Sequence, residues 1–138
     1  MKYKYSICHP EKSEIEYPEQ ILSAEQVKER AIKYPWKSEL QKLKTMKPDE
    51  INYSPSLDFK NVDNNYSFCL TAEGEPEDIS FSVWYSRPIM KKIFFGLFGE
   101  KEKFEVIDKE FTKEDSFKLL DKFLNQDCDW IEKEMNKK

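Results

Sequence analysis

The sequence feature that most constrains the fold is an alternation of apolar and polar residues between positions 79 and 86. One set of alternate positions holds three serines and Trp84. The other set is apolar and consists of Ile79, Phe81, Val83 and Tyr85. Because successive side chains of a strand point to opposite faces of a sheet, this pattern predicts a strand with one buried face.

Similar segments surround this strand, and residues 56–111 therefore predict an antiparallel meander. Alternation is visible from Ser56 to Lys60 and again from Tyr66 to Ala72, and the residues between, 63–65, tolerate the positive φ of a hairpin turn. Arg87-Pro88 predicts the end of the central strand, because proline cannot donate to a ladder of hydrogen bonds.

The apolar run at residues 93–98 has two interpretations. It is either a buried strand, followed by a glycine-containing turn near 99–102, or an exposed loop that contacts a membrane surface or a partner, since lysines flank it on both sides. The strand is the favoured interpretation.

The N-terminal part, about residues 20–50, predicts two helices. Ser23 and Gln26 form a capping-box pattern before a helix over 24–34, and a second helix begins at Trp36 and ends before Pro48. Before them, the alternation from Tyr3 to Cys8 is that of a short strand.

The C-terminal part, about residues 112–136, predicts a long helix. Thr112 and Asp115 match a helix-start pattern, and apolar residues then recur at intervals of three and four. Asn125-Gln126-Asp127 leaves a second possibility open, in which the helix breaks there and an aspartate caps a final short turn.

These segments together predict one α+β domain over residues 1–138. Its antiparallel sheet has four or five strands between about 55 and 111, with the N-terminal helices beside it and the C-terminal helix covering its apolar face. An apolar fraction of 38% with 14% aromatic residues predicts a small, aromatic-rich core.

Charge and cysteine content exclude several classes of protein. A net charge of −4 argues against a nucleic-acid-binding protein. The odd number of widely spaced cysteines fits free thiols in a reducing compartment.

No segment has the length and apolarity of a signal peptide or a transmembrane helix, so we expect a cytoplasmic protein that does not bind membranes.

The sequence predicts no catalytic residues, no metal site and no cofactor. His9 is the only histidine, and it is interpreted as a loop residue. No glycine-rich nucleotide motif and no nucleophile elbow are present.

Two surfaces remain as candidate sites. The first is an acidic turn that we expect to contact a basic protein, formed by Glu73, Glu75, Glu77 and Asp78. The second is the outer face of the meander, which has the composition of a shallow ligand-binding floor with Arg87 at its edge. Its residues are Cys69, Ser80, Ser82, Trp84 and Arg87.

The expected function is that of a small acidic protein-interaction domain without catalytic activity, such as a regulator or an immunity-type inhibitor of a basic partner. This expectation rests on the charge of residues 51–86, which contain six acidic residues and one lysine. The alternative is a small-molecule-binding protein or an enzyme that uses the outer face, with Cys69 as its nucleophile.

Overall fold

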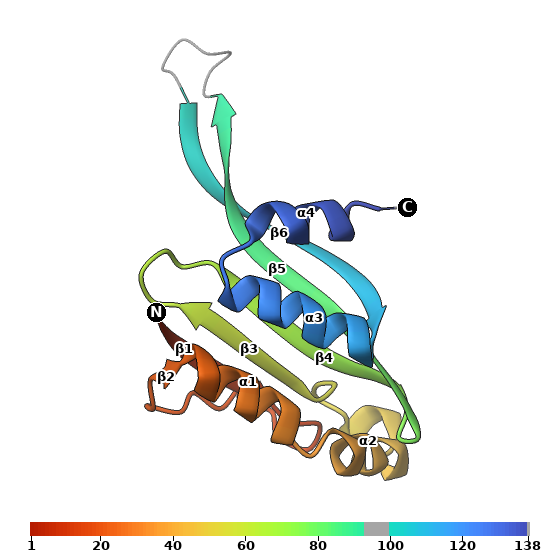
Figure 1. The fold of residues 1–138 in the computed structure, drawn as a ribbon. Coiled ribbons are helices and arrows are strands. Elements are labelled where there is room, and N and C mark those ends of the chain that lie inside the picture. Colours follow the sequence, from red (N-terminus) through yellow and green to blue (C-terminus); the bar gives the residue numbers. More distant parts are fainter. Residues whose placement is uncertain (93–99, 138) are drawn as a thin grey trace.

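A computed structural model describes residues 1–92 and 100–137 of the chain (Figure 1). The described elements form an α+β fold with a six-stranded antiparallel sheet and four α-helices. In chain order they are β1 (Lys2–Cys8), β2 (Leu22–Ser23), α1 (Ala24–Lys33), α2 (Trp36–Thr45), the 3-10 turn η1 (Pro48–Glu50), β3 (Ser56–Asn61), β4 (Ser67–Glu75), β5 (Asp78–Lys92), β6 (Glu100–Thr112), α3 (Lys113–Leu124) and α4 (Cys128–Met135). The apolar run at 93–98 lies outside the described residues, so both of its interpretations remain predictions.

The strand order in the described sheet is β2-β1-β3-β4-β5-β6. Strands β3 to β6 are the predicted meander, but the predicted number of strands was too low. Strand β1 pairs with β3 from Tyr3 to Cys8, and the short β2 pairs with β1. The pairing of β1 with β3 joins segments about fifty residues apart, and local alternation carries no information on such a pairing.

Strand β5 continues through Pro88 to Lys92, so the predicted end at Arg87-Pro88 was wrong. The pairing of β4 with β5 stops at Ser86, and beyond that point β6 is the one strand among the described residues that pairs with β5. Pro88 therefore lies where β5 has one neighbour, and a missing N–H is tolerated on a strand edge. Figure 1 shows the two strands extending past the rest of the sheet.

The N-terminal helices form as predicted. The Ser23 side chain accepts a hydrogen bond from the Gln26 amide, and the Gln26 side chain accepts one from the Ser23 amide. Trp36 begins α2, donates its indole N–H to the Ala31 carbonyl, and packs edge-on against Phe81 of β5. A single buried tryptophan thus joins both helices to the sheet.

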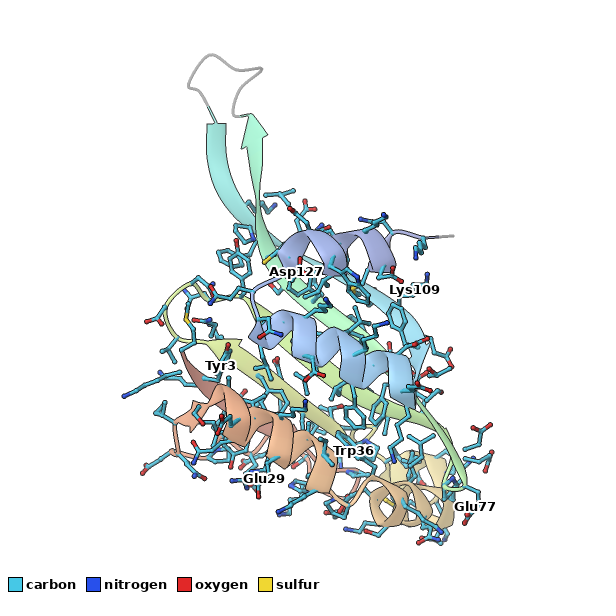
Figure 2. The ribbon with its side chains drawn as sticks, in the orientation of Figure 1. Tyr3, Glu29, Trp36, Glu77, Lys109 and Asp127 are labelled. Atoms are coloured by element: carbon cyan, nitrogen blue, oxygen red, sulfur yellow. The ribbon has the colours of Figure 1, made fainter. Side chains whose placement is uncertain are left out.

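The C-terminal segment is two helices, which decides between the two predicted possibilities. Asn125 caps the end of α3, Gln126 has a φ of 59°, and the Asp127 side chain accepts a hydrogen bond from the Trp130 amide. A residue with positive φ ends an α-helix, and an aspartate at the following position starts the next one. The label at Asp127 in Figure 2 marks this start.

The core lies between the helices and one face of the sheet. Figure 1 shows α1, α3 and α4 lying across that face. Aromatic residues dominate the contact, as predicted, and Phe123 of α3 packs against the rings of Tyr3, Phe68 and Tyr85 from three different strands. Each of these three strand residues is fully buried. No helix among the described residues has the length and apolar character needed to cross a membrane.

Candidate functional site: an open sheet face

The opposite face of the sheet carries no helix within the described residues (Figure 1). The alternation predicted for residues 79–86 is confirmed here, because Phe81, Val83 and Tyr85 are buried while Trp84 is 43% exposed. Strand pairing places residues of β4 beside those of β5 on this face: Cys69 of β4 pairs with Trp84, and Thr71 pairs with Ser82. We call this surface the open face.

Strand register places five side chains in one row across the open face. Antiparallel pairs bring directly opposite side chains within contact distance on the same face of the sheet. From β1 to β6 the row reads Ser6, Asp58, Cys69, Trp84 and Asp108. A carboxylate therefore flanks the Cys69–Trp84 pair on each side.

A hollow of about 320 Å³ lies over the centre of this row. It is lined by side chains from four strands, and nearly all of them are small or polar. The lining residues are Asp58, Ser67, Cys69, Thr71, Glu73, Trp84, Ser86 and Val106. The open face is therefore concave where the predicted ligand-binding residues Cys69 and Trp84 meet.

Asp58 is the residue of this hollow that the sequence prediction missed. Its Oδ1 atom is shielded from solvent and has no hydrogen-bond partner among the described residues. Burial raises the pKa of the Asp58 carboxyl, and the charge of Lys60 partly opposes that rise. An unpaired, desolvated carboxylate oxygen is costly, so a donor from outside the chain that reached this carboxylate would stabilise it.

Further carboxylates surround the hollow and add to its negative charge. Burial and the charge of Glu110 raise the pKa of Glu73, which lines the hollow from β4. Glu110 itself accepts a hydrogen bond from the Ser80 hydroxyl at 3.1 Å. Together with Asp58 and Asp108, these groups make the open face acidic around Trp84.

Cys69 is poorly suited to be a nucleophile. Burial, and then the charge of Asp58, raise the pKa of its thiol to about 12, although the nearby Thr71 hydroxyl lowers it slightly. A thiol with such a pKa is almost entirely protonated at neutral pH, whereas the thiolate is the reactive form. Cys69 therefore contributes a small, weakly polar surface to the hollow.

Arg87 does not lie at the edge of the open face as predicted. Its guanidinium lies on the helix-covered side of the sheet, where it pairs with the Glu132 carboxylate of α4 and donates to the Glu105 carbonyl at 3.0 Å. The prediction failed because β5 continues as a regular strand, so residue 87 shares a face with Tyr85. Ser80 and Ser82 do lie on the open face, beyond the residues that line the hollow.

The acidic turn does not form one free patch. The Glu75 carboxylate pairs with Lys44 at 2.8 Å, and the Glu77 carboxylate pairs with Lys37 at 3.1 Å, both lysines coming from α2. Figure 2 shows Glu77 at the turn next to that helix. Glu73 belongs to the open face instead, and Asp78 is the register partner of Glu75 at the start of β5. The sequence could not show that lysines 31 and 40 residues away from their partners approach this turn.

No protein-family model matches this chain, and no curated protein or solved structure was found to be similar to it. Its function is therefore inferred from the geometry of its own residues.

Proposed function

We propose that this chain is a non-catalytic protein-interaction domain that binds a basic segment of a partner on its open face. The observation that carries the proposal is the unpartnered Asp58 oxygen at the hollow, beside the exposed ring of Trp84. In this proposal the binding site lies in the concave centre of the sheet, and the acidic turn has a structural role.

Arginine is the side chain that best fits the hollow. Its planar guanidinium carries five N–H donors and stacks on aromatic faces, and it can pair with a carboxylate through two parallel hydrogen bonds. We expect the guanidinium to stack on Trp84 and to donate to Asp58. The surrounding Glu73, Asp108 and Glu110 would attract neighbouring basic residues of the same segment and increase the association rate.

The absence of catalysis in this proposal rests on the chemistry of the hollow. Its only cysteine has a strongly raised pKa, and no histidine lines it. The three cysteines are free in the structure, which supports a reducing location such as the cytoplasm.

A small cationic molecule is the second candidate ligand. A hollow of about 320 Å³ is at the lower end of the size of small-molecule sites. Such a ligand would use the same Asp58 oxygen, but it would gain nothing from the carboxylates that lie farther along the sheet.

The test is an NMR titration of the ¹⁵N-labelled chain with a capped peptide of alternating glycine and arginine. The matched control peptide carries citrulline, which keeps the shape of arginine without its charge. We expect chemical-shift changes centred on Asp58, Cys69 and Trp84 with the arginine peptide, and affinity that falls with added salt.

Two substitutions locate the binding site. Asp58→Asn and Trp84→Ala should each lower the affinity for the arginine peptide by about tenfold, which corresponds to about 1.4 kcal/mol of binding free energy. Asp49→Asn, on the exposed turn η1, should leave the affinity unchanged. Equal binding of the citrulline peptide, or shifts centred away from the open face, would contradict the proposal. Binding of free arginine amide as tight as that of the peptide would favour the small-molecule alternative.

A further inference from the structure

A second cluster of ligand-type side chains lies where the loop after β1 meets α2. Its members are His9 and Glu11 in that loop and Glu39 in the first turn of α2. One ligand atom from each of these residues lies within 4.8 Å of the others. The cluster thus combines an imidazole with two carboxylates from distant parts of the sequence.

The cluster contains buried polar atoms that the described residues leave without hydrogen bonds. Glu39 is only 8% exposed, and its Oε2 atom has no hydrogen-bond partner within residues 1–92 and 100–137. The same holds for the Nε2 atom of His9 and for the hydroxyl of Tyr34. Native proteins rarely leave such atoms unsatisfied, so three of them in one place point to a missing ligand.

The negative charge of the cluster is also concentrated. The Glu16 carboxylate lies 3.4 Å from His9 Nε2, and Glu11 lies 3.9 Å from His9 Nδ1. Burial raises the pKa of Tyr34, and the charges of Glu39, Glu16 and Glu11 raise it further. A cation placed among these groups would reduce the repulsion between the carboxylates and would supply a partner for the unpaired polar atoms.

Lys42 lies at the rim of the cluster, and its ammonium neutralises part of the negative charge. Its ammonium lies 3.3 Å from a Glu11 oxygen and 3.4 Å from Glu39 Oε1. The lysine side chain is 43% exposed, so it can swing into solvent. It contacts Oε1 of Glu39 and leaves Oε2 free.

We propose that His9, Glu11 and Glu39 form a binding site for a divalent transition-metal ion of the zinc class. Imidazole nitrogen with carboxylate oxygen is a ligand set typical of such ions, whereas calcium and magnesium prefer oxygen alone. Ligands about 2.0–2.2 Å from zinc lie at most about 4.4 Å apart. The cluster must therefore contract slightly, and the exposed Glu11 can provide this movement.

The sequence predicted no metal site because it contains one histidine. Glu39 becomes a neighbour of His9 only when α2 folds beside the loop, and no local sequence pattern indicates this contact. Occupation of the site would link this loop to α2, and it would stabilise the folded chain by mass action.

The test uses the fact that His9 is the only histidine, so every imidazole signal of the chain reports on this site. The imidazole nitrogens of ¹⁵N-labelled protein are observed by NMR while zinc chloride is added. We expect their resonances to shift to values typical of a metal-bound ring as zinc is added, and to return when the zinc is removed by a chelator.

Four variants assign the ligands. Glu39→Gln and Glu11→Gln should each weaken zinc binding by tenfold or more. If the substitution of the buried Glu39 impairs folding, Glu11→Gln alone tests the carboxylate ligands. Lys42→Met should strengthen binding, because the competing ammonium is removed. Glu50→Gln, on the exposed turn η1, is the matched control and should change nothing.

Cys8 is the nearest alternative ligand in sequence, and Cys8→Ser tests it. The proposal requires that this variant keep the response of the imidazole to zinc. Imidazole signals that zinc leaves unchanged in both the unmodified chain and the Lys42→Met variant would overturn the proposal. A response that is lost in Cys8→Ser and kept in Glu39→Gln would overturn it as well, in favour of a thiolate site.

Discussion

The substitution Asp58→Asn should stabilise the folded chain while it weakens the proposed binding. The Asp58 carboxylate is half-buried, its Oδ1 atom has no hydrogen-bond partner in the described part of the chain, and burial raises the pKa of the carboxyl. A desolvated charged group without a full set of hydrogen bonds costs about 1–3 kcal/mol. Lys60 offsets part of this cost, and asparagine still presents polar atoms, so we expect a net gain of about 1 kcal/mol at neutral pH.

The pH dependence of the gain follows from the direction of the pKa shift. A raised pKa in the folded state means that the folded chain binds the proton more tightly than the unfolded chain does. The unmodified protein therefore loses stability as the pH rises from the pKa of an unfolded aspartate through the folded pKa of Asp58. The advantage of asparagine should be fully present at neutral pH and should diminish as the pH falls through that range.

Thermal unfolding at several pH values measures this effect. A gain of about 1 kcal/mol corresponds to a rise in Tm of about 4 °C for a domain of this size. Asp49→Asn is the matched control, since Asp49 is exposed on η1 and its substitution should leave Tm unchanged. A Tm for Asp58→Asn that is lower than that of the unmodified chain at neutral pH, or a gain that is the same at every pH, would refute the reasoning.

Three further predictions concern the core, a turn and a thiol. Phe123→Ala should lower the free energy of unfolding by about 3–5 kcal/mol in urea titrations, because it removes a ring that packs against three strands. Gly74→Ala should also destabilise the chain, because Gly74 has a φ of 84° and an added Cβ would lie 2.7 Å from the Asp78 carbonyl oxygen. Cys69 should react slowly with iodoacetamide at neutral pH, and mass spectrometry should show its rate rising steadily toward alkaline pH.

Each of these predictions has an outcome that contradicts it. An unfolding free energy within 1 kcal/mol of the unmodified value for Phe123→Ala would mean that α3 is not the cover of the core. A stable Gly74→Ala protein would place the turn in another conformation. Rapid alkylation of Cys69 at neutral pH would restore it as a candidate nucleophile.

Local sequence patterns predicted the parts of the fold that are decided by residues close together in sequence. The alternation around Trp84 determined which side of β5 is buried, and the Ser23 capping box determined where α1 begins. Strand β1 was predicted as a strand but not as part of the sheet, and β2 was not predicted; both are held by pairings with residues distant in sequence. The end predicted at Pro88 failed for a related reason, since whether a proline is tolerated depends on how many neighbours the strand has.

The candidate site was predicted in its centre and missed at its edges. Cys69 and Trp84 were predicted because both lie in strong alternations, and they are directly opposite each other on adjacent strands, on the same face of the sheet. Asp58 was passed over as an ordinary polar residue of a strand, and only its register with Ser6 and Cys69 shows it in a hollow. Arg87 was misplaced because the prediction ended its strand too early.

The position of β6 at the edge of the described sheet affects how the protein behaves at high concentration. An edge strand presents unpaired backbone groups that can recruit a strand from another molecule, and this is a common start of aggregation. Between Lys103 and Thr112 this strand carries charged side chains at half of its positions. A second copy that added itself in register would bring like charges together, so the long free edge of the sheet resists the polymerisation that its backbone geometry would otherwise permit.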